Sequence, residues 1–210
     1  MKNIVIVGAS GFAREIKWIV DRMNAVELCW NFLGYIDSHI SGNTVIGDDE
    51  YLLQYSQELS VAIAIADTKQ RQRLAKMYQR NPMLEFPNLI DPAVLMSESV
   101  SMGKGNFICA GSVLTVDIDI GDFCIINLNC TVGHECVFED FVTVSPGANI
   151  SGNVHLSEGV NVGTGCQIIQ GRCVGINTVV GAGAVITRDM PGDCTVAGVP
   201  AKIIKDRRTP

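Results

Sequence analysis

The chain has 210 residues, of which 47% are hydrophobic and 6% aromatic, enough to build one large domain or two small ones. Its formal net charge of -6 argues against nucleic acid as a partner, because nucleic-acid binding depends on basic side chains that contact phosphates. No run of about twenty apolar residues is present, so we expect neither a transmembrane helix nor a membrane partner.

The N-terminal part of the chain predicts alternating strands and helices. Its first apolar run is too short for a signal peptide and is interpreted as a strand. Strands are expected at residues 4–7, 33–37 and 61–66, and helices at 13–22, 48–55 and 68–80. This order predicts a small parallel sheet covered by helices, an α/β Rossmann-like domain. Pro82 and Pro87 mark a link, so we place this domain in residues 1–88.

The turn after the first expected strand suits an anionic ligand. Residues 8–13 are a broken form of the G-x-G-x-x-G motif, with Ser10 and Ala13 in the second and third glycine places. Backbone N–H groups at the start of the following helix can still donate hydrogen bonds to a phosphate. Asp37 ends the second expected strand, where folds of this kind hold a ribose or a base.

The rest of the chain repeats every six residues. From Ile90 to Ile186 every sixth residue is apolar, a period typical of a solenoid with three short strands per coil. Glycine often stands second in the hexad, and we interpret it as a supplier of positive φ. We therefore predict a parallel β-helix with a C-terminal tail over residues 89–210. Its aliphatic faces and open coil edges favour a homotrimer.

The cysteines indicate a reducing compartment. Four of the eight stand fifth in their hexads, where the other residues are small and apolar: Cys124, Cys130, Cys136 and Cys166. We expect them to be buried and free, and no C-x-x-C pair suggests zinc or redox work. The protein is therefore expected in the cytoplasm. Arg172 holds the same fifth place, and the pattern offers no reason for it.

One pair of residues in the repeat suits acid–base chemistry. His134 and Glu135 stand third and fourth in their hexad, places that should point outward at a corner. An imidazole with a pKa near 6.5 is a suitable general base at neutral pH. Glu135 can accept the other ring N–H and fix the tautomer, as the acid does in a catalytic triad. The alternative is an idle surface histidine beside a solvated glutamate.

Two segments of the repeat region, residues 129–136 and 197–202, resemble bacterial sugar acetyltransferases of the hexapeptide-repeat superfamily. That family includes sialic acid O-acetyltransferases and UDP-4-amino-sugar N-acetyltransferases. The first domain resembles theirs too, so the resemblance covers the whole chain. It implies a left-handed β-helix, a trimer of parallel prisms, and acetyl-CoA in the cleft between two prisms. In such an enzyme His134 is the general base and Glu135 its partner.

The resemblance also implies the binding residues. Those for acetyl-CoA are Thr143, Thr164 and Ala182. Those for the nucleotide sugar, all in the first domain, are Ser10, Gly11, Phe12, Asp37, Ser38 and Ala66. Relatives often carry histidine at the positions of Thr143 and Phe12. Because Phe12 replaces that histidine, the identity of the sugar and the choice between an amine and a hydroxyl acceptor stay open.

The predicted function is transfer of an acetyl group from acetyl-CoA to the amine or hydroxyl of a sugar, and the favoured acceptor is a nucleotide-linked amino sugar. The alternatives are a β-helix scaffold with a nucleotide-sensing domain and no turnover, a sialic acid hydroxyl as acceptor, or another acyl donor such as an acyl carrier protein. A β-helical carbonic anhydrase needs three histidines on zinc. The repeat offers only His134 and His155, at different hexad places, so no metal is expected.

Overall fold

The computed structural model describes residues 1–40, 42 and 44–207. The chain divides into two compact units, Met1–Pro92 and Ala93–Pro210. The sequence-based boundary, after residue 88, lies just before this division. Residues 208–210 of the expected C-terminal tail lie outside the described residues.

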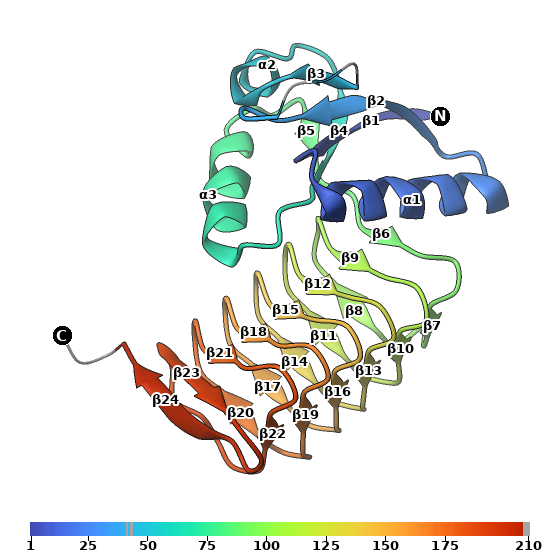
Figure 1. Cartoon of the computed structure of the whole chain (residues 1–210). Helices are drawn as coiled ribbons and strands as arrows, with labels where there is room; N and C mark the ends of the chain where they lie inside the picture. Colours follow the sequence, from blue (N-terminus) through green and yellow to red (C-terminus); the bar gives the residue numbers. More distant parts are fainter. Residues whose placement is uncertain (41, 43, 208–210) are drawn as a thin grey trace. The chain divides into compact units, whose positions relative to one another are not determined.

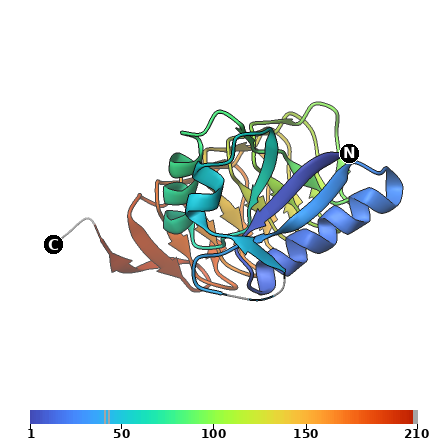
Figure 2. The same ribbon diagram turned by 90° about the horizontal axis from the view of Figure 1, so that it is seen from above.

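The first unit is built on a parallel sheet with the strand order β3-β2-β1-β4-β5 (Figures 1 and 2). Its strands are β1 (Lys2–Val7), β2 (Trp30–Ile36), β3 (Val45–Gly47), β4 (Leu59–Ile63) and β5 (Leu84–Glu85), followed by β6 (Leu89–Ile90). Its helices are α1 (Gly11–Val26), α2 (Asp49–Leu53) and α3 (Thr68–Tyr78). The connection β1–α1–β2 runs toward one edge of the sheet, and the connection β4–α3–β5 runs toward the other. Because such crossovers are right-handed, α1 and α3 lie on opposite faces of the sheet.

The local signals in the sequence explain these elements. The apolar run Ile4–Val7 is buried in the centre of the sheet, as expected for a strand covered on both faces. Asp48 and Asp67 cap α2 and α3, accepting hydrogen bonds from the backbone N–H groups of Tyr51 and Gln70. All three expected strands and all three expected helices are present with shifted ends. Strands β3 and β5 were not expected.

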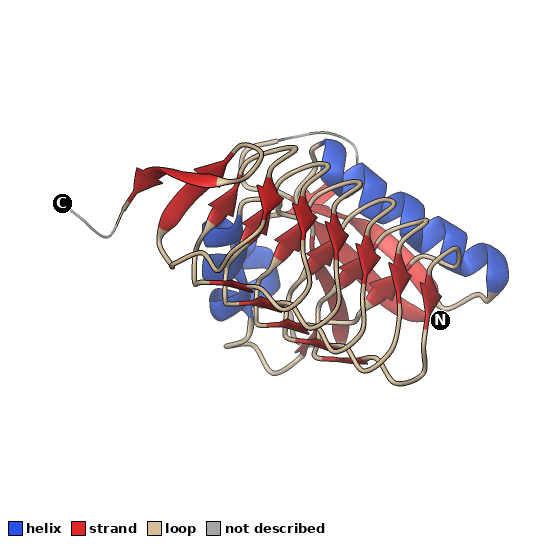
Figure 3. Cartoon of the chain, turned by 90° about the horizontal axis from the view of Figure 1, so that it is seen from below, coloured by secondary structure: helices blue, strands red, loops and turns tan. Residues whose placement is uncertain are grey.

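The second unit is a left-handed β-helix of short strands, which are parallel except for β24, the antiparallel partner of β23 (Figure 3). The strands are β7 (Leu95–Met96), β8 (Ser101–Met102), β9 (Phe107–Ile108), β10 (Val113–Leu114), β11 (Asp119–Ile120), β12 (Ile125–Ile126), β13 (Thr131–Val132), β14 (Val137–Phe138), β15 (Thr143–Val144), β16 (Asn149–Ile150), β17 (His155–Leu156), β18 (Asn161–Val162), β19 (Gln167–Ile168), β20 (Cys173–Val174), β21 (Val179–Val180), β22 (Val185–Ile186), β23 (Cys194–Ala197) and β24 (Lys202–Asp206).

Three sheets form the three sides of the prism. Their orders are β7-β10-β13-β16-β19-β22, then β8-β11-β14-β17-β20, and then β9-β12-β15-β18-β21-β23-β24. Up to Ile186 each strand pairs with the strand one coil away, 18 residues along the chain, as Thr131 pairs with Asn149. From Ile108 to Ile186 the apolar residue that opens each hexad is buried, as Val132 and Ile150 are. The predicted β-helix is thus confirmed.

The expectation that second-place glycines supply positive φ is wrong. Positive φ occurs at the fourth place instead, as at Glu135 (φ 58°) and Gly147 (φ 69°). The second-place glycines are needed for space between coils. A Cβ on Gly133 would lie 2.5 Å from the backbone nitrogen of Gly152, and one on Gly163 would lie 2.6 Å from the carbonyl oxygen of Val180.

The fifth hexad place behaves as expected for cysteine but not for arginine. Cys124, Cys130, Cys136 and Cys166 are buried and free. Burial raises the pKa of the Cys130 thiol. Arg172 turns outward, and its Nη1 lies 3.5 Å from Oδ1 of Asp189, in the irregular segment after the last regular strand. The coil is not distorted there, because Gly171 keeps the φ of 70° typical of this corner.

Among residues 1–40, 42 and 44–207, no helix has both the length and the apolar character needed to cross a membrane.

Candidate active site

His134 and Glu135 form a hydrogen-bonded pair on one corner of the prism, directly after β13. The His134 Nδ1 and Glu135 Oε2 atoms are 2.9 Å apart, and the two side chains are 48% and 66% exposed. Consecutive residues of a strand point to opposite faces. The left-handed backbone of Glu135 breaks that alternation and lets the carboxylate reach the neighbouring ring.

Gly152 supports the imidazole from the next coil. It follows His134 by 18 residues, and a Cβ there would lie 2.4 Å from Nε2 and 2.6 Å from Cε1 of His134. Gly152 is buried, and within the described part of the chain its N–H group donates no hydrogen bond. The sequence analysis did not single out this glycine. The available signal was a glycine one full coil after the candidate base.

Thr164 and Ala182 lie on a different corner of the prism. They occupy the same hexad place in consecutive coils, and the Gly183 N–H donates to the Thr164 carbonyl oxygen at 2.8 Å. Both side chains are exposed, and Cβ atoms on the adjacent Gly165 and Gly183 would have nothing within 4 Å. Thr143, on β15, leads toward this corner and is 6% exposed.

The two corners lie at opposite edges of the sheet β7-β10-β13-β16-β19-β22. In each coil a strand of this sheet follows the corner of Thr164 and precedes the corner of His134. In the coil of His134, for example, β13 lies between Asn129 on the first corner and His134 on the second. Within one chain, therefore, the structure brings His134 and Glu135 together but does not bring them to Thr164 and Ala182.

In the first unit the expected substrate residues share one edge of the sheet. Ser10, Gly11 and Phe12 follow β1, Asp37 and Ser38 follow β2, and Ala66 follows β4. These three strands are parallel neighbours, so their carboxyl ends lie side by side at one end of the sheet. The strand order reverses at β1, and such a switch point is the usual ligand site of these sheets.

Asp37 ties two of these loops together. Its Oδ2 accepts a hydrogen bond from the Ala9 N–H at 2.9 Å, and its Oδ1 accepts from the N–H groups of His39 and Ile40 at 2.8 and 2.9 Å. Burial alone would raise the pKa of Asp37, but the three backbone donors outweigh it and lower the pKa below its ordinary value. The carboxylate is therefore held ionised and oriented at the sheet edge.

The start of α1 is open to an anion. Ser10 is the N-cap residue, yet its side chain makes no capping hydrogen bond, and the first turn of the helix contains no acidic residue. A Cβ on Gly11 would have nothing within 4 Å. A helix N-terminus with these features favours a phosphate group.

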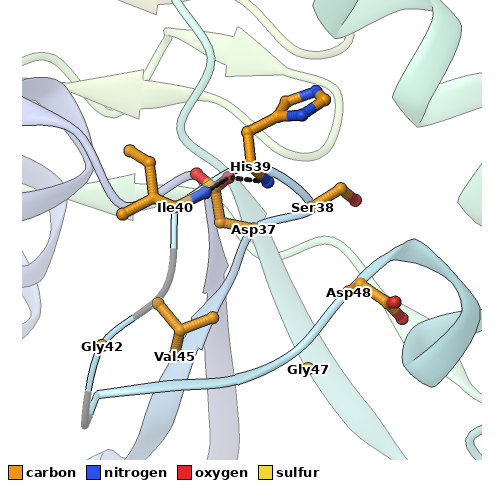
Figure 4. A pocket seen from close by; sticks show the side chains of 8 residues that line it. All are labelled: Asp37, Ser38, His39, Ile40, Gly42, Val45, Gly47 and Asp48. Carbon is orange, nitrogen blue, oxygen red and sulfur yellow. Dashed lines mark hydrogen bonds between the residues drawn. The ribbon is translucent and has the colours of Figure 1, made fainter.

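A cavity of about 450 Å³ lies beside Asp37 and Ser38 (Figure 4). His39, Val45 and Asp48 also line it, and none of these three was expected from the sequence. Figure 4 shows the backbone of His39 and Ile40 turned toward the Asp37 carboxylate at its border. Across the described residues, no group of three or more His, Cys, Asp or Glu side chains is placed to hold a metal ion.

Comparison with known proteins identifies relatives of both units. Residues 3–78 match the family model of the PglD N-terminal domain. The GDP-perosamine N-acetyltransferase of Escherichia coli O157:H7 is 28% identical over 204 residues, covering 92% of this chain and 81% of that protein. A serine acetyltransferase of Synechococcus elongatus is 32% identical over 113 residues, but the match covers 49% of this chain and only 39% of that enzyme.

Two solved structures match nearly the whole chain. The acetyltransferase domain of PglB from Neisseria gonorrhoeae, in complex with acetyl coenzyme A, is 30% identical with a TM-score of 0.88, covering 97% of this chain and 99% of that one. PerB from Caulobacter crescentus, in complex with CoA and GDP-perosamine, is 30% identical with a TM-score of 0.89, covering 97% of each chain.

Proposed function

The chain belongs to the family of sugar N-acetyltransferases of the PglD type, and from this we propose that it transfers an acetyl group from acetyl-CoA to the amine of a nucleotide-linked amino sugar. The observation that supports this best is the His134–Glu135 pair, an exposed imidazole oriented by a carboxylate. The free cysteines favour the reducing cytoplasm as its compartment.

His134 acts as the general base in this proposal. The attacking amine must lose a proton as it bonds to the thioester carbonyl and the CoA thiol leaves. Glu135 accepts the Nδ1–H and thereby keeps Nε2 free to take that proton. Gly152 is our candidate for the oxyanion donor, because its unused N–H belongs to the residue against which the ring lies.

The corner of Thr164 and Ala182 is suited to bind the acetyl donor, acetyl-CoA. Its side chains are small and exposed, and the glycines beside them leave the backbone open to the pantetheine arm. This corner and His134 lie at opposite edges of one sheet. We therefore propose that a site combines His134 of one copy with Thr164 and Ala182 of the next, in a homotrimer. Thr143 contributes from the adjoining sheet.

In the first unit, the carboxyl ends of β1, β2 and β4 are suited to bind the acceptor, the nucleotide sugar. The α1 N-terminus suits the phosphates, and Asp37 and Ser38 border a cavity that can take another part of the nucleotide. Phe12 presents an apolar ring at this edge and favours an apolar group on the sugar, such as the methyl of a 6-deoxy sugar. Two relatives that match more than nine-tenths of the chain act on or bind GDP-perosamine, by their names.

A thiol-release assay with acetyl-CoA tests the proposal. The acceptor panel contains nucleotide-linked 4-amino sugars with UDP, dTDP and GDP, together with sialic acid as the hydroxyl acceptor. We expect turnover with an amino sugar. His134→Ala should lower kcat by about 10²-fold or more, the usual range for a lost general base.

His155→Ala is the matched control, because His155 is also paired with a glutamate in the β-helix but stands on the strand β17 and not on the corner of His134. Its kcat should stay near that of the unchanged protein. Absence of thiol release with every acceptor would favour the scaffold without turnover. Release with sialic acid alone would replace the amine by a hydroxyl acceptor.

A further inference from the structure

An arginine is buried in the first unit. Arg71 belongs to α3 and is only 1% exposed. A guanidinium keeps its charge inside a protein, and taking a charge out of water is costly unless hydrogen bonds compensate for the lost hydration. The groups to which this guanidinium is bonded therefore indicate what its burial achieves.

The Arg71 side chain holds the loop that follows β4. Its Nη1 donates hydrogen bonds to the carbonyl oxygen of Ile65 at 2.8 Å and to that of Ala66 at 3.1 Å. Ala66 is the residue of this loop that the family resemblance assigns to the nucleotide sugar, and it is exposed. A buried cation on α3 is thus bonded to the backbone of a candidate ligand-binding residue.

These two hydrogen bonds fix the direction of two peptide groups. In a trans peptide the C=O and the N–H point to opposite sides. Because the carbonyls of Ile65 and Ala66 point inward to Arg71, the N–H groups that follow them, those of Ala66 and Asp67, point away from it. Both of these residues are exposed, and neither N–H group donates a hydrogen bond to any residue that the structure describes. Successive N–H groups of this kind bind anionic oxygens.

The same loop packs against the turn that follows β1. A Cβ on Gly8 would lie 3.1 Å from the Ala64 carbonyl oxygen and 3.1 Å from Cδ1 of Ile65. The Ala64 N–H also donates to the carbonyl oxygen of Val7 at 3.0 Å. The two outward N–H groups therefore belong to a loop in contact with the turn that leads into α1, where the phosphates are proposed to bind.

We propose that Arg71 is a positioning residue for the acceptor site. It holds the loop so that the N–H groups of Ala66 and Asp67 face an oxygen atom of the bound nucleotide. Its charge polarises both peptide groups and strengthens them as donors. Arg71 itself stays behind the loop and touches no ligand. This inference rests on the proposed function, because it takes the acceptor to be nucleotide-linked.

Substitution of Arg71 separates its charge from its hydrogen bonds. Arg71→Met removes both, Arg71→Lys keeps a charged donor, and Arg71→Gln keeps a neutral one. Titration calorimetry with UDP, GDP and dTDP identifies the diphosphate that the unchanged protein binds and measures its Kd in each variant. We expect Arg71→Met to raise this Kd by about 10-fold or more, the loss of roughly one hydrogen bond to a charged group. Arg71→Lys should retain most of the affinity and Arg71→Gln less.

Steady-state kinetics give a second readout that a purely structural role would not produce. Arg71→Met should raise the KM for the nucleotide sugar by a similar factor, while kcat and the KM for acetyl-CoA change little. The residues proposed to act as the base and to bind acetyl-CoA all belong to the second unit, so the Arg71 loop does not hold them.

Arg73→Met and Leu74→Ala are matched controls on the same helix. Arg73 is exposed, so its substitution removes the same charge without removing a hydrogen bond to the loop. Leu74 is buried, so its truncation lowers the stability of the unit and leaves the guanidinium in place. Neither control should change the Kd of the diphosphate.

An unchanged Kd in Arg71→Met would overturn the proposal, and where that variant does not fold, an unchanged Kd in Arg71→Gln would do so. An equal loss of affinity in either control would also overturn it. Binding of a diphosphate without any acetyl transfer would refute the proposed function and leave the role of Arg71 standing. No binding of any of the three diphosphates to the unchanged protein would overturn both.

Discussion

At the level of single residues, Glu135 adopts a backbone conformation that disfavours any residue with a Cβ. Its φ of 58° lies in the left-handed region, where several coils place Gly or Asn instead. The same conformation recurs at the fourth place of other hexads, as at Phe123 and Phe141, so it is a property of these corners. Here it produces the hydrogen bond to His134 between two consecutive residues.

Gly152→Ala tests whether catalysis needs the His134 ring in its position against Gly152. A methyl group would overlap the ring of His134, which is exposed and can swing outward, so the fold should survive while Nε2 is displaced. We expect kcat to fall by about 10²-fold, the effect of a misplaced catalytic group, with little change in Tm. The backbone N–H is retained, so an unchanged kcat would show that the ring does not need this glycine.

Asp37→Asn tests the hydrogen bonds that the Asp37 carboxylate accepts from two loops at the end of the sheet. The pKa of Asp37 is lowered in the fold, so its ionised form contributes stability above the ordinary value of 3.8, and this contribution disappears as pH falls through the lower folded pKa. We expect Asp37→Asn to be less stable than the unchanged protein at pH 7, with the difference shrinking below pH 3.8. Urea unfolding across this range measures it. A pH-independent difference would assign the effect to packing rather than charge.

At the level of elements, glycine has two separate roles in the hexad. At the second place it leaves room for the next coil, and at the fourth it adopts positive φ. Gly133→Ala drives a methyl group into the backbone of Gly152, whereas a Cβ on Gly147 would have nothing within 4 Å.

We expect Gly133→Ala to cost about 3 kcal/mol of unfolding free energy or more, because neither backbone can yield. Gly147→Ala should cost only about 1–2 kcal/mol, the penalty of a left-handed conformation. Urea unfolding of the two variants compares these costs. Equal losses would mean that the coils separate easily enough to admit a methyl group.

These elements also show what sequence reasoning could reach. The hexad rhythm predicts the coils because each repeat contains its own strand and corner. Strands β3 and β5 have three and two residues, too few to show a period. The role of second-place glycine was misassigned because a sequence does not distinguish a need for space from a need for positive φ. Gly152 was missed because its contact with His134 spans a whole coil.

At the level of the whole molecule, the expected homotrimer rested in part on prism faces rich in exposed aliphatic side chains, and the middle of one face carries polar side chains instead. The aliphatic side chains of the hexads point into the prism, and the outward row of β13, β16 and β19 is the polar ladder Thr131–Asn149–Gln167. These strands therefore do not supply the exposed aliphatic area on which the expected homotrimer rested, and the homotrimer stays a prediction. The same arrangement leaves His134 and Thr164 at opposite edges of one sheet.

Mixing two inactive variants tests whether sites are shared between copies. His134→Ala removes the proposed base, and Thr164→Trp blocks the proposed donor corner with an exposed side chain. In co-expressed mixed trimers, a site is intact when His134 comes from a Thr164→Trp copy and the corner from a His134→Ala copy. Random assembly in a cyclic trimer makes about a quarter of the sites intact. We expect about a quarter of the original acetyl transfer from the mixture and almost none from either variant alone. Activity no greater than the sum of the two variants would show that each site lies within one chain.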